Sequence, residues 1–202
     1  MPEVVLDGEK VDFQGDQPLT AEAVWQLVEN YLGQIGRVIH VFQVDGKEWQ
    51  IPQETTSTVY QEVEIQSLSQ EEKLLEALMG IVSQKESLLE CWRAFAVQTL
   101  SQDRQTMTKS GSAVIQQTRQ LVEFMGVASL LGQSLNASWL EEAQEATNVL
   151  NNFLDEWMSS LESSDPVMLS DLAEERLVPQ LELLFALLQD KVECDLESRI
   201  GQ

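Results

Sequence analysis

The side chains most often used for catalysis are few in this sequence. Its single histidine, His40, lies inside an apolar stretch, and its two cysteines, Cys91 and Cys194, lie in patterns of helical spacing. One histidine without cysteines or carboxylates close by in the sequence cannot supply a zinc site, and a Ser-His-Asp arrangement would lack the Gly-x-Ser-x-Gly motif. The phosphate-binding patterns Gly-x-x-x-x-Gly-Lys-Ser/Thr and Gly-x-Gly-x-x-Gly are missing as well. We therefore expect no catalytic residue and no cofactor.

Carboxylates are the remaining groups that could take part in catalysis or bind a metal, and they are abundant, because the chain has 34 Asp and Glu against 12 Lys and Arg. Glu193, Asp195 and Glu197 could hold a divalent cation weakly, but a solvated helix end explains them more simply. Asp7 and Asp45 do not begin EF-hand loops, because the ligand spacing after each of them is wrong. We therefore predict no metal site, and a carboxylate-based metal binder or enzyme is the least favoured class.

The formal net charge of -22 limits the kind of partner. Such a charge repels phosphate backbones and anionic lipid surfaces, so we expect no nucleic-acid binding, whereas a basic protein partner is compatible with it. No apolar run approaches the roughly 18 residues that span a bilayer, and the first residues lack the pattern of a signal peptide. A cytoplasmic protein is the prediction, with Cys91 and Cys194 as free buried thiols or, alternatively, as one disulfide.

The first 67 residues have the period of β-strands. "VVLDGEKVDF" and "VFQVDGKEWQ" each place Asp-Gly between apolar segments, which predicts two hairpins with type I′ turns. Between them, residues 20–35 have helical spacing, with Thr20 as the N-cap. A polar loop at 52–58 and a last strand at 59–66 complete the region, with Val63 and Ile65 facing inward.

This order of elements resembles a β-grasp, or ubiquitin-like, module with the topology ββαβββ. The segments "VVLDGEKVDF", 20–35, "RVIHVFQVDGKEW" and "VYQEVEIQ" carry the resemblance, which covers the first third of the chain and rests on topology. The chain departs from ubiquitin-type modifiers, because no Gly-Gly tail ends the module, and from ferredoxin-type members, because it has no cysteine cluster. The resemblance implies a non-covalent binding module.

From Ser69 onward the apolar residues follow helical spacing. Ser69 and Glu72 form a capping-box pattern, and "DRQTMTKSGS" is a polar break between two helices. Pro179 predicts a kink or a restart of the helix at 178–179. Four amphipathic helices joined by short turns are typical of an antiparallel bundle. We thus predict an α+β protein with a β-grasp-like domain at 1–67 and a four-helix bundle at 68–202, its helices lying at about 69–104, 112–134, 138–162 and 166–199.

The strand expected at 37–44 is apolar on both sides. Strict alternation would place Val38, Phe42 and Val44 on one face and Ile39 and Val41 on the other. Such a strand is usually covered on both faces, whereas the helix at 20–35 covers only one. Either the rest of the chain covers the second face, or a partner or a second copy does.

Aromatic and apolar residues around this strand are the predicted partner contacts. Trp49 lies beside the second Asp-Gly turn, Tyr60 is expected on the outward side of its strand, and Phe42 and Val44 are the remaining candidates.

Three hypotheses about function follow. The favoured one is a non-catalytic interaction, scaffolding or adaptor protein that binds a protein partner or itself. The alternative is a dedicated chaperone for an exported or assembled subunit, since an acidic surface keeps an aggregation-prone client in solution. The carboxylate-based metal binder or enzyme is the third.

Overall fold

The structure of the protein is a computed structural model, which describes residues 2–13, 15, 17–49, 58–101, 103–163 and 165–201. The chain divides into two compact units, unit 1 (Met1–Lys73) and unit 2 (Leu74–Gln202). Strands in the N-terminal part are followed by helices, so the predicted α+β class is confirmed at that level. Most of the loop predicted at 52–58 lies outside the described residues.

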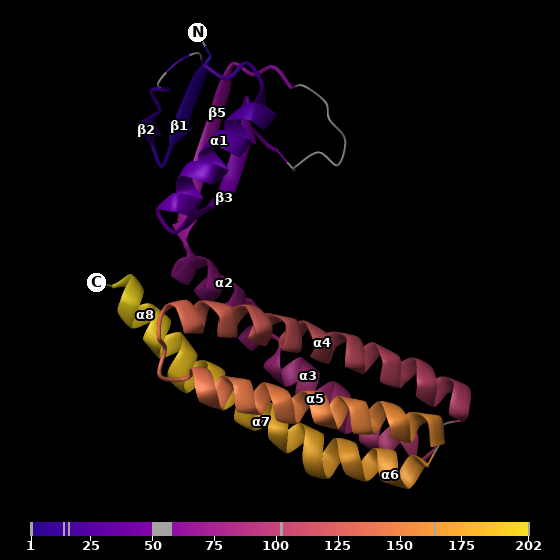
Figure 1. Ribbon diagram of the computed structural model, residues 1–202. Coiled ribbons are helices and arrows are strands. Elements are labelled where there is room, and N and C mark those ends of the chain that lie inside the picture. The colour runs from indigo at the N-terminus through magenta and orange to yellow at the C-terminus, as the bar shows by residue number, and fades with distance from the viewer. Residues whose placement is uncertain are drawn as a thin grey trace. The chain divides into compact units, whose positions relative to one another are not determined.

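The described part of unit 1 forms a sheet whose central strand is the last one in the sequence. The strand order is β2-β1-β5-β3-β4, with β1 parallel to β5 and the other neighbouring pairs antiparallel. Helix α1 (Ala21–Gln34) packs across one face of this sheet (Figure 1). The strands are β1 (Glu3–Leu6), β2 (Glu9–Lys10), β3 (Arg37–Val44), β4 (Lys47–Glu48) and β5 (Glu62–Ser69).

The two Asp-Gly pairs form the predicted hairpin turns. φ is 51° at Asp7 and 83° at Gly8, and 50° at Asp45 and 74° at Gly46. Positive φ at both central residues is what a type I′ turn requires, and Asp and Gly are the residues that adopt it at low cost. The turns connect β1 to β2 and β3 to β4.

The start of α1 is tied to the segment that precedes β5. The Thr20 hydroxyl accepts a hydrogen bond from the N–H of Ala23 at 3.3 Å, which confirms Thr20 as the N-cap. The N–H of Thr58 donates to the Glu22 carboxylate at 3.1 Å, and the N–H of Ala21 donates to the Thr58 carbonyl at 2.9 Å. These bonds fix the first turn of the helix against residues about 36 positions later in the chain.

A β-bulge at His40 changes the faces predicted for β3. Ile39 is paired with Ser67 and Val41 with Gln66, so His40 is an extra residue opposite β5. Ile39 therefore lies on the same face as Phe42 and packs against the core of unit 1, contrary to the strict alternation expected from the sequence. Val38, paired with Leu68, lies on the opposite face together with Val41.

The long helix predicted at 69–104 is two helices, α2 (Gln70–Ser83) and α3 (Lys85–Thr99). The predicted capping box at the start of α2 is confirmed, because the N–H of Ser69 donates to the Glu72 carboxylate at 2.7 Å and the N–H of Glu72 donates to the Ser69 hydroxyl at 3.0 Å. Ser69 is also the last residue of β5, so strand and helix are joined without a loop.

Helix α4 (Arg104–Ser134) begins about two turns before the predicted start at 112. The reason is Asp103, whose carboxylate accepts hydrogen bonds from the N–H groups of Gln105 and Thr106 at 3.0 and 3.2 Å and so caps the helix. The polar stretch that was expected to be a break is therefore the beginning of a helix. Helix α5 (Leu140–Ser163) follows, close to the predicted 138–162.

The C-terminal segment is continuous from Pro166 to Ile200 and alternates α-helical with π-helical turns. The structure has the restart predicted at 178–179, because the π-helical turn η1 ends at Leu177 and α7 begins at Val178, with Pro179 in its first turn. The parts are α6 (Pro166–Asp171), η1 (Leu172–Leu177), α7 (Val178–Leu187), η2 (Leu188–Glu193) and α8 (Cys194–Ile200).

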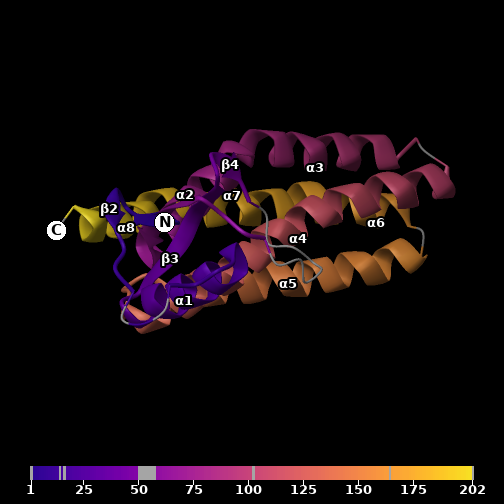
Figure 2. The same ribbon diagram turned by 90° about the horizontal axis from the view of Figure 1, so that it is seen from above.

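Aromatic rings from α3 and α5 fill the centre of unit 2, where the helices run alongside one another (Figures 1 and 2). The rings of Trp92, Phe95 and Trp157 lie 5.3 to 6.0 Å apart, with tilted or edge-on geometry. Gly111 of α4 makes room for Trp157, since a Cβ atom there would lie 2.4 Å from the indole ring, and Gly132 makes room for Trp139 in the same way. These two contacts show that α4 and α5 run in opposite directions.

Candidate functional site

Three of the four predicted partner contacts are buried in the core of unit 1. Phe42, Val44 and Tyr60 are 3%, 7% and 3% exposed. The Tyr60 hydroxyl donates a hydrogen bond to the Pro18 carbonyl at 2.8 Å, so the tyrosine faces inward, and its expected outward orientation is corrected. These residues hold unit 1 together, and their side chains add little to its surface.

Trp49 is the predicted contact that reaches the surface, and it is half-buried. Its ring lies 5.3 Å from that of Phe42 and 6.0 Å from that of Trp25, between ring centres. The three rings form one cluster at the edge of the core. Trp49 can therefore contact a partner only with the part of its ring that is exposed to solvent.

Helix α1 carries an exposed apolar stripe that the sequence analysis did not separate from the core. Leu27, Tyr31 and Ile35 are 51%, 54% and 51% exposed. They follow each other at intervals of four residues and therefore lie in a row along one side of the helix and the residue that caps its end. The buried row of α1 that faces the sheet is different and consists of Ala21, Val24, Val28 and Leu32.

The stripe and the charged residues of α1 lie on different sides of the helix, because Glu29 is two residues from both Leu27 and Tyr31, and residues two apart do not face each other. The charged residues of α1 are Glu22 and Glu29, and the helix contains no lysine or arginine. Over residues 1–67 the sequence has 12 acidic and 3 basic residues. Residues 1–67, which include the stripe, thus carry a net negative charge.

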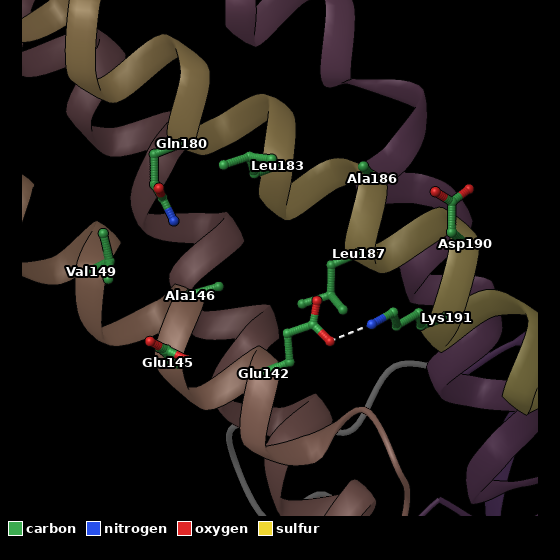
Figure 3. Close-up of a pocket in the computed structure, with 10 residues that line it drawn as sticks. All are labelled: Glu142, Glu145, Ala146, Val149, Gln180, Leu183, Ala186, Leu187, Asp190 and Lys191. Carbon is green, nitrogen blue, oxygen red and sulfur yellow. Dashed lines mark hydrogen bonds and ion pairs between the residues drawn. The ribbon is translucent and has the colours of Figure 1, made fainter.

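Unit 2 has an open groove between α5 and the C-terminal segment, with a volume of about 440 Å³. Figure 3 shows α5 on one side, α7 and η2 on the other, and Leu187 between them. Leu183 on the rim is 66% exposed, whereas Leu187 on the floor is 6% exposed. The lining residues are Glu142, Glu145, Ala146, Val149, Gln180, Leu183, Ala186, Leu187, Asp190 and Lys191.

Acidic side chains dominate the rim of the groove. Glu142, Glu145 and Asp190 line it together with one base, Lys191. The Lys191 ammonium group forms an ion pair with the Glu142 carboxylate across the groove (Figure 3). The lysine thus neutralises one carboxylate, and two negative charges remain on the rim.

The residues whose side chains could take part in catalysis or bind a metal lie on different elements. His40 is exposed at the bulge of β3, Cys91 is half-buried, and Cys194 is exposed, so the expectation of two buried thiols is corrected for Cys194. Both thiols are free. The Asp195 carboxylate accepts hydrogen bonds from the Trp139 indole at 2.9 Å and from Arg199 at 3.0 Å, which gives this acidic residue a structural role.

Within the described ranges, no group of three His, Cys, Asp or Glu side chains is arranged to hold a metal ion. In the same part of the chain, every helix is too short or too polar to cross a bilayer.

Two carboxyl groups have shifted pKa values, and both shifts arise at helix starts. Burial raises the pKa of Glu22, but hydrogen bonds from the N–H groups of Glu22 and Thr58 and from the Thr58 and Thr20 hydroxyls bring it below its ordinary 4.5. Hydrogen bonds from the hydroxyl and N–H of Thr106 lower the pKa of Asp103 from its ordinary 3.8. Both groups are held as carboxylates by capping, which is a structural role.

Comparison with known proteins gives no further guide, since no family model, curated protein or solved structure matches the chain.

Proposed function

We propose that this protein is a non-catalytic adaptor that binds a partner protein through helix α1. The observation that carries the proposal is the exposed stripe of Leu27, Tyr31 and Ile35. Helix α1 already buries a separate apolar row against the sheet, so folding of unit 1 gives no reason for the second row. Grouped apolar side chains on a surface are typical of interaction sites, and tyrosine is enriched at such sites.

The architecture that we propose for the two units agrees with this role. We assign unit 1 to the β-grasp-like modules, and the strand order β2-β1-β5-β3-β4 with parallel β1 and β5 supports the assignment. We assign unit 2 to the antiparallel four-helix bundles, supported by the contacts that α3, α4, α5 and α7 make with one another. In this assignment unit 1 presents the stripe on α1, the helix that packs against the sheet.

The partner that suits the stripe has apolar side chains surrounded by lysine or arginine. Residues 1–67 contain 12 acidic and 3 basic residues, and a basic margin on the partner would complement this excess. A second copy of this chain fits less well, because its formal charge of -22 repels an identical molecule.

Photo-crosslinking in the native cells tests the proposal. A photoreactive phenylalanine analogue in place of Tyr31 lies within the stripe, and the same analogue in place of Gln117, which is exposed on α4, serves as the control position. We expect one discrete adduct from position 31 and none from position 117. Leu27→Glu should abolish the adduct, whereas Leu19→Glu should not, because Leu19 is 77% exposed but lies before α1.

Three results would contradict the proposal. The first is the same adducts from both positions. The second is an adduct from position 31 that survives Leu27→Glu. The third is a broad mixture of adducts, which would favour a chaperone with many unfolded clients. An adduct of twice the mass of the chain would show that the occupant is a second copy.

A further inference from the structure

The groove between α5 and the C-terminal segment is long enough to bind a short helix. On α5 its lining runs from Glu142 to Val149, and on the other side it runs from Gln180 to Lys191. At the rise of an α-helix these stretches are roughly 10 and 16 Å long, which corresponds to two to three helical turns. An amphipathic helix that lies in a groove usually inserts anchors over such a length.

The floor of the groove is apolar and lined in part by small side chains. Ala146 and Ala186 stand on opposite sides, with Leu187 between them and Leu183 and Val149 beside them. Alanine allows the backbone of a third helix to approach closely, and Leu183, at 66% exposed, is available to a partner. An apolar side chain that enters the groove would therefore lose its contact with water on several sides.

The backbone at one end of the groove is π-helical. Asp190 and Lys191 belong to η2 (Leu188–Glu193), whose hydrogen-bond pattern adds a residue to the helical turn. Such turns are rare and occur frequently at functional sites. Here the π-turn carries the two charged residues that line this end of the groove, which is a second observation in favour of a binding role.

We propose that this groove binds a basic amphipathic helix of a partner protein, with apolar anchors on the floor and lysine or arginine side chains against the rim. Glu145 and Asp190 supply the negative charge that such a helix complements, while Glu142 is paired with Lys191. A second copy of this chain is a poor occupant, because its formal net charge of -22 repels an identical molecule. The binding does not depend on the stripe of α1, so the protein would have two docking surfaces, one on each unit.

The probes for this proposal are two synthetic helices of about 15 residues, long enough to be partly helical alone. Both carry leucines at i, i+3 and i+7; one has lysines and the other glutamates at the flanking positions. Fluorescence anisotropy of the labelled helices with the full chain gives the affinity. We expect saturable binding of the lysine helix, and little binding of the glutamate helix.

Charge-matched variants separate insertion into the groove from general attraction to an acidic protein. Leu183→Glu and Leu130→Glu add the same charge, since Leu130 is 72% exposed on α4, outside the groove. We expect Leu183→Glu to weaken binding of the lysine helix roughly tenfold and Leu130→Glu to leave it within twofold. General attraction predicts that both variants bind the helix as well as the wild type or better.

Lys191→Ala should strengthen binding of the lysine helix, in contrast to Leu183→Glu, which should weaken it. Removal of the lysine releases the Glu142 carboxylate, so we expect the lysine helix to bind several-fold more tightly at low salt. Leu27→Glu, in the stripe of α1, should leave this affinity unchanged, which keeps the two docking surfaces distinguishable. The proposal is overturned by absent or unsaturable binding, by equal binding of the two helices, or by an affinity that does not respond to Leu183→Glu.

Discussion

The carboxylate of Asp7 accepts two hydrogen bonds from Ser67, one from its N–H and one from its hydroxyl, both 2.7 Å long. Asp7 thus belongs to a hairpin turn and at the same time holds the end of the central strand, 60 residues later. Asp45 does the same at the other end of β5, where it accepts from the N–H groups of Gln61 and Glu62 at 2.8 Å. The repeated Asp-Gly pair therefore fixes β5 at both ends.

Asp7→Ala should destabilise unit 1 by about 1–2 kcal/mol, because it leaves the N–H and hydroxyl of Ser67 without their acceptor. The measurement is hydrogen exchange of peptides from β5 (Glu62–Ser69), since exchange there reports the opening of unit 1. Asp7→Asn, which keeps one oxygen acceptor and tolerates positive φ, should lose less. Asp12→Ala, at an exposed position, should change exchange little; equal effects of all three variants would refute the explanation.

Gly111→Ala should destabilise unit 2 by about 1–3 kcal/mol, because the added Cβ would lie 2.4 Å from the Trp157 ring. Gly126→Ala on the same helix is the matched control: among the described residues, no atom beyond the adjoining part of α4 lies within 4 Å of its added Cβ, so the higher helix propensity of alanine should stabilise by about 0.5–1 kcal/mol. Urea unfolding followed by helical circular dichroism measures both. A stabilising Gly111→Ala would show that Trp157 can move without cost.

Two buried threonines should respond in opposite directions to replacement by valine. Thr118 is 0% exposed and accepts a hydrogen bond from the Trp92 indole at 2.9 Å, so Thr118→Val should cost about 1–3 kcal/mol. Thr99 is also 0% exposed, but its hydroxyl has no hydrogen-bond partner among the described residues, so Thr99→Val should be neutral or stabilising by up to about 1 kcal/mol. Calorimetric unfolding of the two variants compares them directly. If both variants lose stability equally, the indole hydrogen bond is not what makes Thr118 important.

The stabilisation by Asp103 should depend on pH in a defined direction. Hydrogen bonds from Thr106 lower the pKa of Asp103 in the folded protein below 3.8. Its contribution is therefore fully present above pH 3.8 and is lost as the pH falls through the lower folded-state pKa. Asp103→Ala should lower the urea midpoint of unit 2 at neutral pH, and the difference from the wild type should shrink in acid. Asp103→Ser, a cap that does not titrate, should show no such convergence with Asp103→Ala.

The sequence alone predicted the features of the fold that depend on neighbouring residues. The Asp-Gly turns, the Thr20 cap and the Ser69–Glu72 capping box were correct because a few consecutive residues determine them. The change from strands to helices was also visible, since the apolar period changes from two to about 3.6 along the chain.

The predicted helix boundaries were wrong where the local sequence was ambiguous. Asp103 was assigned to a break although aspartate is among the favoured N-cap residues, and the glycine and serines of "KSGS" favoured the break. Gly111 is tolerated in α4 because the Trp157 ring occupies the space beside it, and a contact between residues 46 positions apart has no signature in sequence.

The candidate sites depended more on tertiary structure. The row of Leu27, Tyr31 and Ile35 was visible as a spacing of four, but only the position of the sheet shows that Val24, Val28 and Leu32 are the buried row. Tyr60 was assigned to the surface because its hydrogen bond to Pro18 joins residues 42 positions apart. The groove consists of residues from α5, α7 and η2, which are brought together only by folding.

Composition and period by themselves determined that this chain is acidic, that strands precede helices, and where the tight turns and several caps lie, because these properties arise from adjacent residues. Tertiary structure decided which apolar residues are covered. One extra residue at His40 turns Ile39 toward the core, since a bulge reverses the faces of the residues before it relative to those after it. The exposed stripe and the acidic groove also depend on tertiary packing, because an apolar side chain lies in the core or on the surface according to what packs against it.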